Sequence, residues 1–453
     1  MRSRISLLLL VACCAMASAR QEVTWDFQRT AALTGGRSFR IENSLGNISI
    51  HTQAKGEVEI HASIKCSSDR MEDARDGCDR IKIHLEESSS GVWVRTEYPH
   101  GDFFNGRHNL SYSVSYDITM PETAPLEVRN RFGAVSVSDL HAPANIDNGN
   151  GRILFTGGRG RQRMENSFGD VEVARNDGDV TIVNANGQVT ASDVTGALDV
   201  RNRFGDIRAA NIGKRLDISA GNGNVTATNL GGTATIGDSF GKVTVRDAKG
   251  DVTVQNQNGL VDVTGVTGTA DLRTSFDAVR FSRIDKGVTV RAQNSTVTGD
   301  TVGASAVVDT NFGGIELHGV KGGARATAGN SNIRLTDIGG EVYVKTSFGG
   351  VTVEDVAGPI TVDGQNVSVT VRAKGAKKCQ PISLSSSFGP IRVTVAQGVG
   401  YDVTAKTSFG RIVSQPAILV NGQIGGDSLT GRIGGGGCEL KLANQNGNID
   451  IVN

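Results

Sequence analysis

Proline is scarce in this chain, and long apolar runs and an excess of either charge are missing. Its 453 residues include 8 prolines, and its 47 basic side chains are matched by 47 acidic ones. Because balanced charge creates no strong field, we expect no nucleic-acid partner. No stretch beyond the N-terminus approaches the length of an apolar membrane helix, so we expect no integral membrane span.

Glycine, in contrast, is abundant, with 59 residues. Together with many β-branched residues and with Asn, Asp and Ser, it gives the composition of short strands joined by tight turns. The composition therefore predicts an all-β protein.

The first nineteen residues have the pattern of a secretory signal peptide. Basic residues in Met1 to Arg4 precede an apolar run from Ile5 to Ala12, and Ala17-Ser18-Ala19 provides a cleavage site. The pattern predicts export to the periplasm, the outer surface or the medium. The segment Leu10 to Cys13 also resembles a bacterial lipobox, so a lipid anchor on Cys13 is the alternative to a free exported protein.

Four cysteines lie beyond the signal segment. An even number in an exported protein indicates disulfides, and proximity favours the pairs Cys66–Cys78 and Cys379–Cys438 over the two other pairings. The rival reading, a zinc site, is weaker because the spacings are long and no CxxC occurs.

An eighteen-residue repeat begins at Leu126 and continues without a gap through fourteen coils to residue 377. The tenth position of every coil is Val or Ile, and the third is nearly as strict. Positions one and three, and again ten and twelve, are apolar at the spacing of a strand. We therefore predict a parallel β-solenoid, with strands over positions one to seven and nine to thirteen, a Gly turn at eight and an inward residue at fifteen.

Position seven alternates strictly between two residue types. The alternating residues are Phe132, Asn150, Phe168, Asn186, Phe204, Asn222, Phe240, Asn258, Phe276, Asn294, Phe312, Asn330, Phe348 and Asn366. We expect these rings to face inward, each spreading over the smaller Asn of the next coil. If they face outward instead, they form an aromatic strip that repeats about every 9.6 Å and suits stacking on sugar rings.

Position five is often Asn, which predicts a hydrogen-bonded ladder along the same corner. The Asn residues at this position are Asn130, Asn148, Asn166, Asn184 and Asn202.

Both ends depart from the repeat. We assign residues 20–125 to a first coil copy, Phe39 to Ile50, and a β cap, then 126–378 to the regular solenoid and 379–453 to irregular coils and a C-terminal cap. At the C-terminal end we expect coils around Phe388 and Phe409, a Gly-rich loop from Gly422 to Gly437, and a last Asn-type coil around Asn446.

The export signal, the inserted β region ending in Ile118-Thr119-Met120-Pro121 and the N-x-F/N-G-x-V-x-V coils resemble a bacterial putative adhesin family of unknown function. That family is related in pattern to the head-domain auto-transporter adhesins. The resemblance covers nearly the whole mature chain and implies a β-solenoid. It brings no catalytic residues with it.

An enzyme on this scaffold would need clustered acids on one outer face. Position eleven, which we expect to face outward, carries side chains of both charge signs, and no pair of acids recurs there. Its residues are Thr190, Arg208, Thr226, Thr244, Asp262, Arg280, Thr298, Glu316, Arg334, Thr352 and Thr370. We therefore expect a non-enzymatic adhesin-like or envelope-scaffolding surface without a cofactor, whose partner is a cell-surface glycan or an envelope protein. The alternative is a polysaccharide lyase or hydrolase. A weaker candidate, a metal site, comes from His100, Asp102 and His108.

Overall fold

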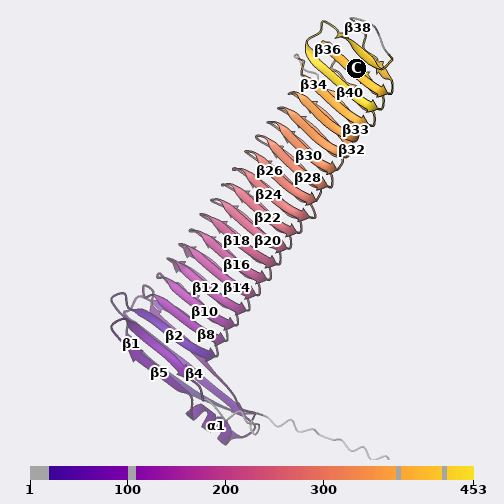
Figure 1. The fold of residues 1–453 in the computed structure, drawn as a ribbon. Coiled ribbons are helices and arrows are strands. Elements are labelled where there is room, and N and C mark those ends of the chain that lie inside the picture. The colour runs from indigo at the N-terminus through magenta and orange to yellow at the C-terminus, as the bar shows by residue number, and fades with distance from the viewer. Residues whose placement is uncertain (1–19, 100–108, 374–378, 421–425) are drawn as a thin grey trace, which may run out of the picture.

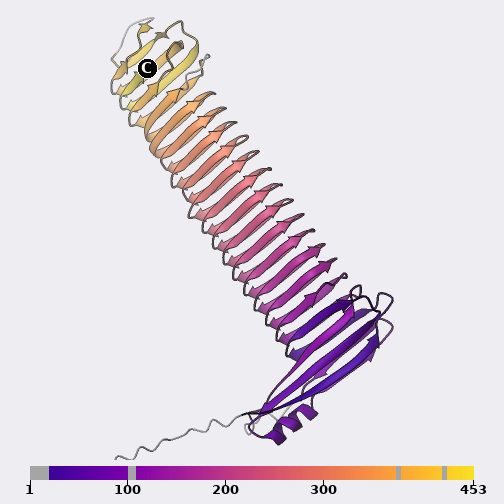
Figure 2. The same ribbon diagram turned by 180° about the vertical axis from the view of Figure 1, so that it is seen from behind.

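The structure, a computed structural model, describes residues 20–99, 109–373, 379–420 and 426–453. Successive coils stack into a long rod with the N-terminal elements at one end and the C-terminal strands at the other (Figure 1). Each coil contributes one strand to each of two parallel sheets, which are seen from opposite sides in Figures 1 and 2. The predicted parallel β-solenoid is confirmed.

The first sheet contains the strands that end at position seven. In order of stacking they are β8 (Leu126–Phe132), β10 (Ala144–Asn150), β12 (Gln162–Phe168), β14 (Val180–Asn186), β16 (Leu198–Phe204), β18 (Leu216–Asn222), β20 (Ala234–Phe240), β22 (Val252–Asn258), β24 (Ala270–Phe276), β26 (Val288–Asn294), β28 (Ala306–Phe312) and β30 (Ala324–Asn330).

The second sheet contains the strands that begin at position ten. They are β9 (Val135–Ser138), β11 (Ile153–Arg159), β13 (Val171–Asp177), β15 (Val189–Val194), β17 (Ile207–Ile212), β19 (Val225–Leu230), β21 (Val243–Ala248), β23 (Val261–Val266), β25 (Val279–Ile284), β27 (Val297–Val302), β29 (Ile315–Val320) and β31 (Ile333–Ile338). The next two strands, β32 (Val342–Val356) and β33 (Ile360–Ala373), run through the corner and belong to both sheets.

Strand pairing follows the eighteen-residue register. Val128 pairs with Ile146 and Ile146 with Met164, so each coil places the same position over the one before it. All three side chains are 0% exposed. Burial of one such side chain stabilises the fold by roughly 1.5 to 3 kcal/mol, and stacking repeats that contribution along the rod.

Glycine fills position eight in ten of the fourteen regular coils, where one coil approaches the next closely; Asp277, Ser295, Ser331 and Val367 stand there in the other four. A Cβ added to Gly187 would lie 2.2 Å from the carbonyl oxygen of Gly169, and its φ of 132° is one that other residues rarely adopt. The predicted Gly turn is therefore a position where two backbones touch.

A second corner, at position fourteen, was not predicted. Its backbone is left-handed in thirteen successive coils, and in ten of them the residue is not glycine: Asp139, Arg175, Asp193, Asn211, Asn229, Asp247, Arg283, Thr301, Asp337 and Asp355, with φ between 54° and 58°. Asp and Asn dominate because short polar side chains tolerate this conformation best. The second strand consequently continues to position fifteen rather than ending at thirteen.

The N-terminal cap is built from β1 (Gln21–Ala32), β2 (Ser38–Leu45), β3 (Ile48–Gln53), β4 (Glu57–Ser68), α1 (Met71–Asp79), β5 (Lys82–Glu87), β6 (Gly91–Glu97) and β7 (Ser111–Pro121). The early coil copy lies where expected, because β2 pairs in parallel with β8 and β3 with β9. Strand β6 covers β2 and β7 covers β3, and β5, β4 and β1 add antiparallel strands outside them.

The C-terminal coils stack out of chain order. They comprise β34 (Ile382–Phe388), β35 (Ile391–Thr394), β36 (Tyr401–Phe409), β37 (Ile412–Ser414), β38 (Ile418–Val420), β39 (Ser428–Ile433), β40 (Cys438–Asn446) and β41 (Ile449–Val452). Strand β40 pairs with β34 on one side and with β36 on the other. The coil around Asn446 was expected to come last, and this is wrong, since it is inserted between the coils of Phe388 and Phe409. The expected Gly-rich loop is also wrong in part, because it contains β39.

Both predicted disulfides are present. Cys66–Cys78 joins β4 to α1, with 5.8 Å between the Cα atoms. Cys379–Cys438, with 5.6 Å between the Cα atoms, joins the segment before β34 to the start of β40. The second bond therefore fastens the inserted coil to the coil beneath it.

Position eleven faces outward as expected, except that Thr244 is only 7% exposed. A matched pair on β27 avoids this exception and tests the register. Val297→Asp puts an unpaired charge into the stack and should cost about 3 to 5 kcal/mol, whereas its neighbour Thr298→Asp should change the free energy of unfolding by less than about 0.5 kcal/mol. Urea unfolding measures both, and equal losses would contradict the register.

Removal of the second disulfide should loosen only one end of the rod. Replacing Cys379 and Cys438 by Ser should cost about 2 to 4 kcal/mol, because the bond closes a loop with a sequence separation of 59. Hydrogen exchange should then quicken in β36 and β40 but not in β22, since solenoid coils depend mainly on their neighbours. Uniform loss of protection along the rod would contradict this expectation.

Candidate binding surface

The position-seven rings face outward, so the expectation that they are buried is wrong. Eight of the nine aromatic side chains are 46% to 55% exposed, and the ninth is 75% exposed. We call these nine residues the Phe stripe: Phe132, Phe168, Phe204, Phe240, Phe276, Phe312, Phe348, Phe388 and Phe409. Along the regular coils the strands that end at position seven form a straight stack (Figure 1).

The rings are excluded from the interior because position five already fills the corner. In β16, Leu198, Val200 and Asn202 are buried, and both Arg203 and Phe204 are exposed. The two-residue alternation therefore ends at position five, where the chain begins to turn. Extrapolating it to position seven produced the error.

The alternation of Phe and Asn is kept between neighbours in space. In the first sheet Asn366 pairs with Phe388, Phe388 with Asn446, and Asn446 with Phe409. Along the chain, by contrast, Phe409 follows Phe388 with no such Asn between them. Each ring in the part of the stack that starts at β8 is therefore separated from the next ring by one coil.

Buried amides hold the corner beneath the stripe. The Asn202 side chain donates to the carbonyl oxygens of Gly187 and Gly205, at 2.9 and 3.0 Å, and Asn166 bonds Gly151 and Gly169 in the same way. The predicted amide ladder is present only in part. Asn130 donates to Asn148 at 3.2 Å and Asn148 to Asn166 at 3.4 Å, but the later amides bind glycine carbonyls instead.

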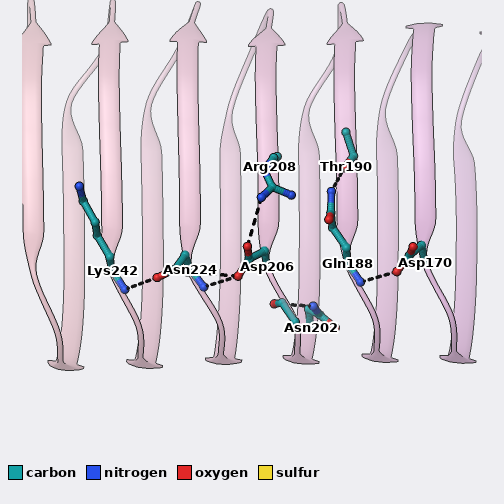
Figure 3. A network of polar contacts seen from close by, with 9 residues as sticks. Asp170, Gln188, Thr190, Asn202, Asp206, Arg208, Asn224 and Lys242 are labelled. Atoms are coloured by element: carbon teal, nitrogen blue, oxygen red, sulfur yellow. Dashed lines mark hydrogen bonds and ion pairs between the residues drawn. The ribbon is translucent and has the colours of Figure 1, made fainter.

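A second polar column runs along the other side of the corner, at position nine (Figure 3). Asp170 accepts the backbone N–H of Gln188 at 2.8 Å, Asp206 that of Asn224 at 2.9 Å, and the Asn224 side chain that of Lys242 at 3.0 Å. The backbone that carries the stripe is thus tied on both sides, which fixes the spacing between the Cα atoms of the ring residues.

Polar groups lie next to the rings. Position six supplies hydroxyls such as Ser167 and Ser275, and the intervening amides of Asn150, Asn222 and Asn294 are exposed. A line of apolar rings bordered by amides and hydroxyls can stack on apolar faces and hydrogen-bond polar groups at the same time.

A groove of 960 Å³ lies along the second corner, among positions fourteen to sixteen of six successive coils. Asn211 donates to Asp193 at 2.7 Å, and Asn229 donates to Asn211 at 3.0 Å, which forms a ladder on one rim. Nothing in the sequence analysis pointed to this groove. The recurrence of Asp, Asn and Gly at position fourteen was the available signal.

Three acids line the groove, and they are spaced at or beyond the upper limit for paired-carboxylate catalysis. Asp193 and Asp247 are three coils apart, about 14 Å, and Asp247 and Asp285 are two coils apart, about 9.6 Å along the axis. Glycosidases hold their two carboxyl groups within about 5 to 9.5 Å. In addition, Asp247 faces Arg283 at 3.9 Å.

Within the described ranges, no group of three His, Cys, Asp or Glu residues could hold a metal ion. His100, Asp102 and His108, like the signal segment and Cys13, lie outside those ranges. In the same part of the chain, no helix is long and apolar enough to cross a membrane.

At position five, Asp238 is a carboxylic acid where the next coil carries the amide of Asn256. It is 5% exposed, and burial raises its pKa, with partial opposition from the backbone N–H groups of Ser239 and Phe240. A raised pKa means that the ionised form costs stability at neutral pH. This cost disappears as the pH falls through the folded-state pKa.

Asp238→Asn should therefore stabilise the protein at pH 7 by about 1 kcal/mol, because an amide can donate to Gly223 and Gly241 as Asn256 donates to Gly241 and Gly259. The gain in melting temperature should shrink as the pH is lowered and Asp238 becomes protonated. Asp309→Asn, on the outer face, is the control. A gain that is independent of pH would contradict the assignment.

Comparison with known proteins adds little. No family model matches the chain, and no curated protein does. Among solved structures, the chain aligns with a putative cell adhesion protein from Clostridium sporogenes at 9% identity, covering 95% of this chain and 99% of the other, with a TM-score of 0.17. A TM-score this low supports no statement about function.

Proposed function

We propose that this chain is an exported, non-enzymatic rod of the adhesin type that binds surface polymers along its length. The observation that carries the proposal is the Phe stripe. Nine rings, each about half exposed or more, present on the order of 900 Å² of aromatic surface to solvent in one line, if each exposes about 100 Å². The Asn coils divide this surface into separate rings at a fixed period, and exposed aromatic side chains in a regular row suit a binding surface.

Rigidity supports the same proposal. The corner is fixed by glycine contacts and by two hydrogen-bonded columns, so little conformational freedom is lost when a ligand binds. Export is supported by the signal-like segment and by two disulfides, which are stable in oxidising compartments. Intact-mass analysis of protein isolated from the envelope distinguishes cleavage after Ala19 from a lipid on Cys13.

Binding and catalysis can be separated in one experiment. Residues 20–453 are incubated with insoluble envelope and plant polysaccharides, and both adsorbed protein and released sugar ends are measured. We expect saturable adsorption without release. Reducing ends or unsaturated sugars would instead indicate a lyase or hydrolase, for which the acid-lined groove is the candidate site.

The stripe is tested by a triple variant, Phe204→Ser, Phe240→Ser and Phe276→Ser, which should lower adsorption at least tenfold. Its matched control replaces Thr190, Thr226 and Thr298 of the second sheet by Ala, and this variant should adsorb like the native protein. Equal adsorption by both variants would exclude the stripe as the binding surface. If neither the native protein nor the variants adsorbed, the proposed function would be excluded.

A further inference from the structure

We infer that the Phe stripe binds an extended β-linked polysaccharide that lies parallel to the rod axis, with one ring beneath every second sugar. This inference rests on the proposed function and names the ligand class of its site. Shape, period and polar surroundings support it independently.

The stripe is long, and it is only one residue wide. It extends over the coils from β8 to β36, which at the spacing of parallel strands is about 75 Å. Polar residues lie beside some of the rings, as Arg203 and Asp206 lie beside Phe204, whereas small residues such as Ala278 and Gly314 occupy position nine beside others. A globular partner would contact only part of such a line, whereas a linear chain can follow all of it.

The period of the stripe matches a twofold sugar chain. Rings recur every second coil, about 9.6 Å apart, which is close to the length of two sugar units in an extended β-1,4-linked chain. In such a chain successive sugars present opposite faces. The same apolar C–H face therefore returns to the protein at every second sugar, where the next ring lies.

The Asn residues fit the sugars between the rings. Asn222 lies between Phe204 and Phe240 in the register, and Asn294 lies between Phe276 and Phe312. Both amides are exposed. Each amide has donors and an acceptor with which to bind hydroxyl groups of the intervening sugar.

A second copy of the chain is the competing occupant, because rings of one stripe could enter the Asn gaps of another. Charged residues beside some of the rings, such as Arg203 and Asp206, make this less favourable, since the centres of protein interfaces are depleted of charged residues. Sedimentation velocity of the native protein measures this alternative directly.

The test uses cello- and chito-oligosaccharides from the disaccharide to the decasaccharide, with malto-oligosaccharides of the same lengths as the curved, α-linked control. Calorimetry should give affinities that rise roughly twofold to tenfold for each two sugars added, as each new ring is engaged. Malto-oligosaccharides should bind at least tenfold more weakly at equal length.

Spacing is tested with a swap that keeps composition constant. The double variant Phe240→Asn with Asn258→Phe moves one ring by a single coil, so it retains nine rings but breaks their period. We expect it to lose as much affinity as Phe240→Ala for long oligosaccharides, while Phe240→Tyr keeps native affinity. Melting temperatures identify any variant that loses binding by unfolding.

Native affinity in the swapped variant, equal binding of malto-oligosaccharides, or no dependence on length would overturn the inference. The inference would also be overturned if the native protein formed a dimer that Phe240→Ala dissociates and bound no oligosaccharide. Adsorption of the native protein to envelope polysaccharides in any of these cases would leave the proposed function standing and remove only its ligand class.

Discussion

The approach of successive coils at position eight governs the rest of the structure. Where Gly187 meets Gly169, two backbones touch without room for a Cβ, and this contact marks the place where the chain turns, while the hydrogen bonds between parallel strands set the height of a coil. The buried Asn or Thr at position five bonds the same corner, and the Val and Ile of the two sheets follow in register. An error at the corner would displace every side chain beyond it.

Outward rings follow from this arrangement. Since the interior of the corner is occupied by position five, a large side chain at position seven has only the outside available. Alternation with Asn then spaces the rings, and the fixed backbone keeps them in line. The surface that we propose for binding is therefore produced by the same contacts that stabilise the rod.

The sequence was sufficient for the fold and insufficient for the direction of the rings. Fourteen Val or Ile residues at position ten define the register, and relative proximity along the chain favoured both disulfides over the other pairings. The period of two residues, however, holds only while a strand stays straight, so it misplaced Phe204 at the turn. Position fourteen was overlooked because Arg175, Arg283 and Thr301 interrupt its Asp and Asn residues. The order of the last coils was not predictable, because the coils of Phe409 and Asn446 have compatible patterns.

The inserted coil at the C-terminal end imposes an order of assembly. In the body of the rod each new coil can dock on the one made before it, so the stack can grow as the chain emerges. Strand β36 has no such template, since its parallel neighbour β40 is formed by residues 438–446, which come later in the chain. The tip must therefore wait for a downstream segment, and the disulfide between Cys379 and Cys438 can form only when that segment has arrived. Growth of the rod thus ends in a closure step, after which no further coil can be added in the same way.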